Sequence, residues 1–272
     1  MALAMVSPFT YDGYSKQIRE FAEWVVEYVH NCNINAGTGW IAHFAGYRWG
    51  KNEPTWKEGV ETRREFHVNL VSNLGNEAEL LSIAKKIVVD WGGIKERPYD
   101  MRDVPGMRSA LVELHNETSN VQWFSEHLDC LSFTQYPRIA SHSKIYEAYA
   151  PSKWTIYDSR VATAIACLAH KYWQQEGQGT VSPYLKLGFP QGRGRQCPYP
   201  SEFPLVGTHK QAALSFVYAS WLVRRIAEIL NADRKYGWPP TIDDPERWAP
   251  LDAGWAVYSV EMALWMMGEN RF

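Results

Sequence analysis

Residues 132–170, SFTQYPRIASHSKIYEAYAPSKWTIYDSRVATAIACLAH, contain the pattern that decides the fold. In both halves of this stretch, apolar side chains recur at spacings of three and four residues, which is typical of one face of a helix. These positions are Ile145, Ala148 and Tyr149 in the first half, and Val161, Ala164, Ile165 and Leu168 in the second. Pro151 ends the first helix. The stretch therefore predicts two helices, the second from about 158 to 174, joined by a short extended link at 154–157.

The same helical period continues on both sides of this stretch. It predicts helices over about 15–31, 80–88, 107–118, 119–131, 209–231 and a last one that carries Trp255, Tyr258, Met262 and Trp265. Gly92 and Gly93 in the sequence WGGI are expected to stop the helix that covers 80–88. No stretch alternates apolar and polar residues between turn signals, so strands are minor at most. The predicted fold class is mainly α.

Two segments lack a clean period. Residues 32–57 are expected to form a loop or short helices, and residues 176–208, rich in Gly and Pro, an extended surface excursion. The chain reads as a single helical unit over 1–272. Within it the sequence predicts one lobe from 1–100 with 209–272, a second lobe from 101–175, and the insertion at 176–208.

Composition excludes several classes of protein. Of 272 residues, 46% are hydrophobic and 21% charged, which excludes wholesale disorder. The formal net charge of −2 leaves no global basic field, so any nucleic acid must be bound by a local patch. The chain has 13 Trp, most of which we expect in the core and some of which we expect beside a planar ligand.

The N-terminal residues and the cysteines indicate the compartment. The chain starts without a secretory signal, and no apolar stretch is long enough to span a membrane. Cys32, Cys130, Cys167 and Cys197 are scattered, with no metal-ligand spacing. We therefore expect a reduced cytoplasmic protein with no metal, no cofactor and no membrane partner.

Lys144 and Asp158 are the candidate catalytic residues. We expect Lys144 in the first turn of its helix, where the helix dipole and partial burial lower the pKa of a lysine and expose a nucleophilic amine. Asp158 stands just before the next helix, which is an N-cap position. Taken singly, a lysine is more often a solvated side chain and an aspartate only a cap.

The run from Tyr136 through Lys144 to Asp158 resembles the helix-hairpin-helix DNA glycosylases, and among them bacterial proteins with an oxoguanine-glycosylase-like fold. The resemblance covers about forty residues. It implies two helical lobes around a cleft, with Lys144 in the place of the family's nucleophile and Asp158 in the place of its catalytic aspartate. The implied activity is excision of an oxidised or modified purine from DNA through a lysine Schiff base, with abasic-site lyase activity. Relatives that occur beside anti-phage genes imply a role in defence.

Other residues are candidates for contacts with substrate or DNA. They are Arg138, His142, Ser143, Tyr157, Arg160 and Trp265. A surface role for His142, a salt bridge for Arg160 and a core position for Trp265 are the simpler interpretations.

Two other hypotheses stay open. The chain could be a non-catalytic module that binds a modified base or nucleic acid on the same fold. It could also be an all-helical scaffold in which Lys144 and Asp158 have no chemical role. Neither the base recognised nor any protein partner follows from the sequence.

Overall fold

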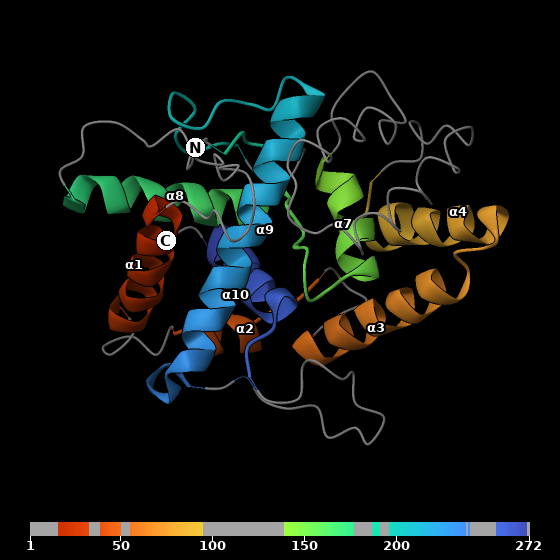
Figure 1. The fold of residues 1–272 in the computed structure, drawn as a ribbon, viewed down its shortest axis with the longest axis horizontal. Coiled ribbons are helices and arrows are strands. Elements are labelled where there is room, and N and C mark those ends of the chain that lie inside the picture. The colour runs from red at the N-terminus through yellow and green to blue at the C-terminus, as the bar shows by residue number, and fades with distance from the viewer. Residues whose placement is uncertain are drawn as a thin grey trace, which may run out of the picture.

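The computed structural model of the protein describes residues 16–32, 39–49, 55–94, 139–176, 187–190, 196–237, 239 and 254–270. Nearly all of its regular structure is helical, which confirms the mainly α prediction (Figure 1). The α-helices are α1 (Lys16–Cys32), α2 (Trp40–Ala45), α3 (Trp56–Ser72), α4 (Glu77–Lys85), α7 (Ile139–Tyr149), α8 (Ser159–Glu176), α9 (His209–Ala232) and α10 (Val257–Asn270). A π-helical stretch, η2 (Lys86–Trp91), continues α4, and a single 3-10 turn, η5 (Arg234–Tyr236), follows α9.

Helix α10 is the central element of the core. Nearly all its side chains are buried, as expected for a helix that is apolar on every side. It packs against α8, α2 and α9, while α1 lies against α9 and α8. Gly268 allows the close approach to α8, because a Cβ atom there would lie 1.9 Å from the backbone oxygen of Arg160.

Helices α3, α4 and α7 form a second group beside this core (Figure 1). Helix α7 contacts α3, η2 and α9. Helix η2 ends at the Gly92-Gly93 pair, where Gly93 has a φ of 66° that favours glycine. The stop predicted at WGGI is therefore confirmed. Because α7 packs on α3 while α8 packs on α10, these contacts cross the predicted lobe boundaries, and the lobe division stays a prediction.

The longer helices follow the predicted periodicity closely. In α1 the predicted face is the buried one, with Phe21, Val25 and Val26 fully covered. Helix α3 was not predicted, because its buried face contains Gly59 and Arg63 and so lacks an apolar period. The short helix α2 falls within residues 32–57, where the sequence predicts either a loop or short helices. The predicted helices at 107–118 and 119–131 lie outside the described residues.

Within the predicted surface excursion at 176–208, residues 187–190 are buried, which contradicts the prediction there, whereas most of residues 196–208 are exposed. Leu187, Phe189, Phe203 and Val206 are all buried. A parallel bridge joins Phe189 to Leu205. These four side chains belong to the core, on which they pack despite the many glycines and prolines around them.

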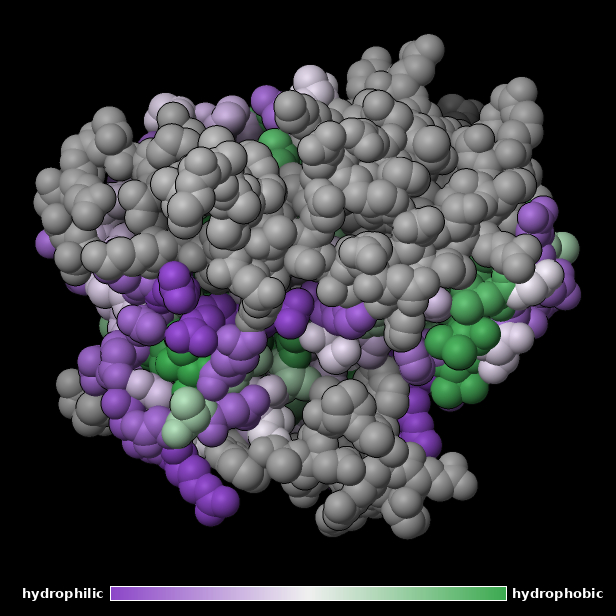
Figure 2. All heavy atoms as spheres, in the orientation of Figure 1, coloured by the Kyte–Doolittle hydropathy of each residue, from purple (hydrophilic) through white to green (hydrophobic). Residues whose placement is uncertain are grey.

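On the surface, hydrophobic side chains gather over α3 and α4 (Figure 2), where Val68 and Val71 of α3 are exposed. Across the described ranges, no helix combines the length and the apolar character needed to span a bilayer.

Candidate functional site

Lys144 lies in the interior of helix α7, with only 2% of its surface exposed. Its Nζ donates a hydrogen bond to the backbone oxygen of Ala140, one turn earlier, at 2.7 Å. It also lies 5.4 Å from the centroid of the Trp49 ring. The prediction that Lys144 occupies the first turn is wrong, because α7 begins at Ile139 and includes the polar residues 141–143. The helix dipole is therefore not what acts on this amine.

Burial is the main influence on the Lys144 amine. It lowers the pKa of Lys144, because a charged ammonium loses its hydration in the interior. The carboxylates of Asp158 and Glu261 oppose this shift, whereas Arg63 and Arg160 add to the lowering of the pKa. The neutral, nucleophilic form of this amine is therefore easier to reach than that of a solvent-exposed lysine.

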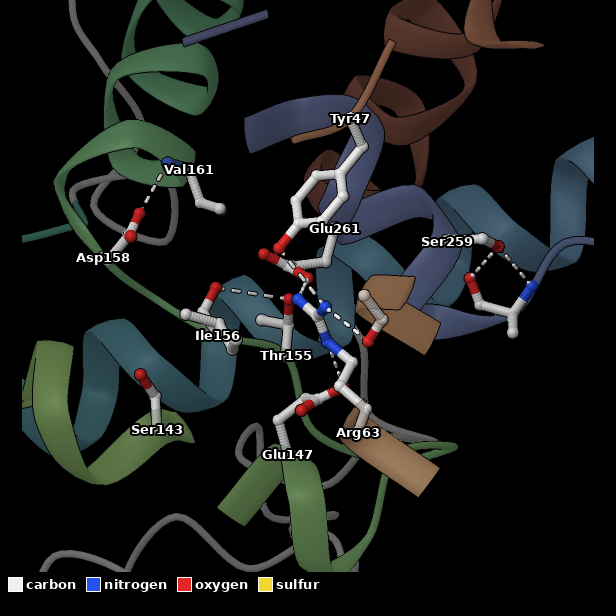
Figure 3. A network of polar contacts seen from close by, with 12 residues as sticks. Tyr47, Arg63, Ser143, Glu147, Thr155, Ile156, Asp158, Val161, Ser259 and Glu261 are labelled. Atoms are coloured by element: carbon white, nitrogen blue, oxygen red, sulfur yellow. Dashed lines mark hydrogen bonds and ion pairs between the residues drawn. The ribbon is translucent and has the colours of Figure 1, made fainter. Parts of the chain in front are cut away.

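Asp158 caps helix α8, as predicted. Its Oδ1 accepts hydrogen bonds from the backbone nitrogens of Arg160 at 2.9 Å and Val161 at 3.2 Å. Figure 3 shows the carboxylate turned toward the start of α8. These two bonds tie the carboxylate to the first turn of α8 and satisfy two of its backbone amides. Asp158 thus supplies a fixed negative charge that acts electrostatically on Lys144.

The link at 154–157 fixes the positions of Lys144 and Asp158 relative to each other. The backbone nitrogen of Tyr157 donates to Ser143 Oγ at 3.0 Å, which ties the residue before Asp158 to the residue before Lys144. The backbone nitrogen of Thr155 donates to Ser220 Oγ at 3.3 Å. Since both serines are buried, these bonds fix the link against α7 and α9.

A buried ionic network is centred on Arg63 (Figure 3), and its members Arg63 and Glu261 act electrostatically on Lys144. Arg63 places Nη2 at 2.8 Å from Glu261 Oε2 and Nε at 3.2 Å from Glu147 Oε1. Its Nη1 donates to the hydroxyl of Tyr47 and to the backbone oxygen of Gly59, both at 3.3 Å. All three charged side chains of the network are fully buried.

Tryptophan rings form a wall beside the amine. The Trp49 ring is stacked on Trp91 with centroids 5.0 Å apart, and lies 5.4 Å from the centroid of Trp265. The guanidinium of Arg160 lies 4.7 Å from the Trp265 centroid. Lys144 therefore lies against the Trp49 ring, and Arg160 lies against the Trp265 ring. Both arrangements favour cation–π attraction between the side chain and the ring.

The structure brings most of the predicted site residues into this region, but buries them. His142, Ser143, Tyr157 and Trp265 are covered. Tyr157 donates its hydroxyl to the backbone oxygen of Gly188 at 3.1 Å. These four therefore have packing or positioning contacts in this state.

Arg160 is partly exposed and pairs with Glu269 at 2.6 Å, which confirms the predicted salt bridge. Arg138 lies outside the described residues.

The residues around the pair, Trp49, Arg63, Glu147 and Glu261, are not among those that the sequence pattern predicts for the site. For Glu261 a signal exists, because it is the only charged residue between Val257 and Gly268 in an otherwise apolar helix. Arg63 gives no such signal, since it lies among other charged residues of α3.

Within the described ranges, no group of three or more His, Cys, Asp and Glu side chains could hold a metal ion. Cys32, Cys167 and Cys197 are free thiols.

Comparison with known proteins returns no match: no family model, no curated protein and no solved structure is similar to this chain.

Proposed function

We propose that the protein is a DNA N-glycosylase with abasic-site lyase activity, acting on an oxidised or modified purine. The observation that carries this proposal is the buried Lys144 amine, whose pKa is lowered, within the electrostatic field of the capped Asp158 carboxylate. A desolvated amine beside a fixed negative charge is the pair that Schiff-base chemistry at a sugar carbon requires.

Each group has a defined role in the reaction. The neutral Lys144 amine attacks C1′ of the target nucleotide, and the base leaves with the electrons of the C–N bond and takes up a proton. Asp158 stabilises the positive charge that develops at C1′. The sugar ring then opens to a Schiff base, which can lose the C2′ proton and the 3′ phosphate by β-elimination. Hydrolysis returns the amine of Lys144.

The proposed function requires that the substrate reach the amine of Lys144. The amine is covered in this state, and a glycosylase substrate must be flipped out of the duplex to reach it. We infer that side chains around Lys144 move when DNA binds, and that Trp49 or Trp265 then borders the extruded base.

Borohydride trapping tests the proposal. The protein is incubated with a duplex that carries a single abasic site, in the presence of borohydride, and the covalent adduct is measured on a denaturing gel. We expect an adduct with the native chain and none with Lys144→Ala. Lys153→Ala is the matched control, because burial also lowers the pKa of Lys153, which lies in the turn that follows α7. An adduct that persists in Lys144→Ala would refute the assignment.

A non-catalytic module on the same fold is the second candidate. The hydrogen bond from Lys144 to Ala140 and the burial of the amine favour it, because both oppose attack in the closed state. For such a module we expect binding to DNA with a modified base, no trapped adduct and no strand cleavage.

A further inference from the structure

The indole of Trp49 shields the amine of Lys144. The amine lies 5.4 Å from the centroid of this ring, and only 2% of the surface of Lys144 is exposed, whereas Trp49 is partly buried. The side chain of Lys144 also passes close to the end of η2, because a Cβ atom at Gly92 would lie 3.0 Å from its Cδ. The hydrogen bond of the amine stays within α7, so the Trp49 ring is the contact from another part of the chain that covers it.

The Trp49 indole has the shape and the contacts of a bound purine. Indole and purine are both planar systems of a five-membered and a six-membered ring. The indole is stacked on Trp91, with centroids 5.0 Å apart and planes at 22°, and lies 5.4 Å from the centroid of Trp265. Its Nε1 donates to the backbone oxygen of Trp91 at 2.6 Å. Proteins hold an unstacked base in the same way, by stacking on aromatic rings and by hydrogen bonds at its edge.

The two rings against which the indole lies have other contacts that hold them. The Trp91 ring lies 5.7 Å from the centroid of Phe66 and 5.1 Å from the guanidinium of Arg63. The Trp265 ring lies 4.7 Å from the guanidinium of Arg160. Since neither ring depends on the indole alone for its position, both can remain in place when the indole moves out.

Trp265 also has a buried donor that the indole cannot satisfy. Only 6% of the surface of Trp265 is exposed, and its Nε1 has no hydrogen-bond partner in the described part of the chain. An indole has a ring donor but no ring acceptor, whereas a purine has acceptor nitrogens in both rings. Because buried donors are rarely left unpaired, this one favours a ligand that brings an acceptor.

We propose that the space that the Trp49 indole fills against Trp91 and Trp265, the tryptophan slot, is the binding site of a purine base, and that Trp49 closes it until the base arrives. A purine in the tryptophan slot lies beside the amine of Lys144 and can donate an N–H to the oxygen of Trp91, as the indole does. The inference rests on the proposed function, for which it names the place of the extruded base. Trp49 is then the ring that moves, and Trp265 borders the base.

Ligand binding by Trp49→Gly tests the tryptophan slot without DNA. Removal of the indole leaves an apolar recess, and such spaces bind flat molecules that match their shape. We expect Trp49→Gly to bind free purine and free indole in calorimetric titrations, and the native protein to bind neither. Indene has the two rings of indole without the N–H. It should bind about tenfold more weakly than indole, because it leaves the oxygen of Trp91 without a donor.

Trp24→Gly is the matched control. Trp24 of α1 is a partly buried tryptophan that is also stacked on a ring, that of Tyr28, with centroids 4.6 Å apart. It also donates its indole N–H, to Gln175 at 3.1 Å. Loss of this indole should give no binding of purine, because no second ring system and no amine at Trp24 reproduce the arrangement around Trp49.

Reductive methylation with formaldehyde and cyanoborohydride measures how accessible the amine of Lys144 is, with the methylated lysines located by mass spectrometry. Phenylalanine at position 49 keeps a ring but loses the N–H that holds the indole on Trp91. We therefore expect Lys144 to be methylated about tenfold faster in Trp49→Phe than in the native protein, with the rate at Lys153 unchanged. This variant keeps the test decisive if Trp49→Gly does not fold.

Three results would overturn the proposal: no binding of purine by folded Trp49→Gly, equal binding by the native protein or by Trp24→Gly, or equal methylation of Lys144 in Trp49→Phe and the native protein. Neither measurement uses DNA. Purine binding by Trp49→Gly without borohydride trapping on an abasic duplex would refute the glycosylase proposal and leave the tryptophan slot standing. Lys144-dependent trapping without purine binding would refute only the slot.

Discussion

The buried amine of Lys144 lowers the stability of the folded protein, whereas the amine of a surface lysine would not. Its pKa is lowered by burial, so between that lowered value and the ordinary value of 10.5 the unfolded chain binds more protons than the folded one. Stability therefore rises with pH across this window, and the contribution is lost as the pH falls. A residue kept at such a cost is typical of a functional site.

Lys144→Met should therefore separate stability from activity. We expect the variant to be more stable than the native protein at pH 6, and to lack the rise in stability that the native chain shows toward pH 10. Urea denaturation at several pH values measures this, with Lys86→Met, at an exposed lysine of η2, as the control. A less stable Lys144→Met variant at pH 6 would show that the amine contributes through its hydrogen bond to Ala140 more than its burial costs.

The two candidate residues could be found in the sequence because their signals are local. Asp158 stands at the start of a periodic apolar stripe, and Lys144 lies in the preceding helix of the same segment. The partners of Lys144 could not be found, because Trp49, Arg63 and Glu261 are far from it along the chain. Only the packing of α3, α7 and α10 with the segment that follows α2 brings them together.

Asp158 caps helix α8 and also carries a negative charge, and substitutions can separate these two properties. Asparagine at position 158 keeps a side-chain oxygen that can accept from the nitrogens of Arg160 and Val161, whereas alanine does not. We expect Asp158→Ala to lower the free energy of unfolding by about 0.5–2 kcal/mol, and Asp158→Asn to lower it much less.

Both Asp158 variants should nevertheless lose most of the proposed base excision, since neither carries the negative charge. Thermal denaturation and a single-turnover excision assay on the same preparations check the two effects. Full excision by Asp158→Asn would show that Asp158 acts only as a cap.

The contact between α10 and α8 leaves no room for a side chain at Gly268. A Cβ atom there would overlap the backbone of Arg160, so Gly268→Ala must push the start of α8 away from α10. We expect a loss of about 1–3 kcal/mol in the free energy of unfolding, as for an overpacked core. Gly75→Ala is the control, because a Cβ atom at Gly75 meets nothing within 4 Å. Equal effects of the two substitutions in denaturant titrations would contradict this packing.

Periodicity predicts the helices whose buried face is mostly apolar, such as α1 and α9. It failed where the buried face is polar or lacks a side chain. In α7 the buried residues 141–143 look like a polar helix start, yet Ser143 is buried because it accepts from the nitrogen of Tyr157. In helix α3, Gly59 packs against Tyr47 and Met262. A hydrophobic period does not reveal this contact, because glycine has no apolar side chain.

Across the whole molecule, the charge balance limits how DNA can be held. The formal net charge is −2, and three cations of the described residues, each at least partly exposed, are paired with carboxylates. These pairs are Arg160 with Glu269, Arg225 with Glu23 and Glu228, and Lys235 with Glu27. The positive charges of these three side chains are thus partly neutralised, and the negative net charge opposes non-specific attraction to a polyanion.

Binding to undamaged duplex should therefore depend only weakly on salt. We expect a slope of log K against log salt smaller in magnitude than roughly 4, which corresponds to about four neutralised phosphates. Fluorescence anisotropy between low and physiological salt measures this slope. A slope near −10, typical of about ten phosphate contacts, would show a basic surface that this charge distribution does not predict.

The position of the covalent bond tests the glycosylase proposal most directly. The native protein is trapped by borohydride on a duplex with one abasic site, digested with protease, and the modified lysine is located by tandem mass spectrometry. We predict a single adduct on the Nζ of Lys144. An adduct on another lysine, on the N-terminal amine, or spread over several amines would contradict it.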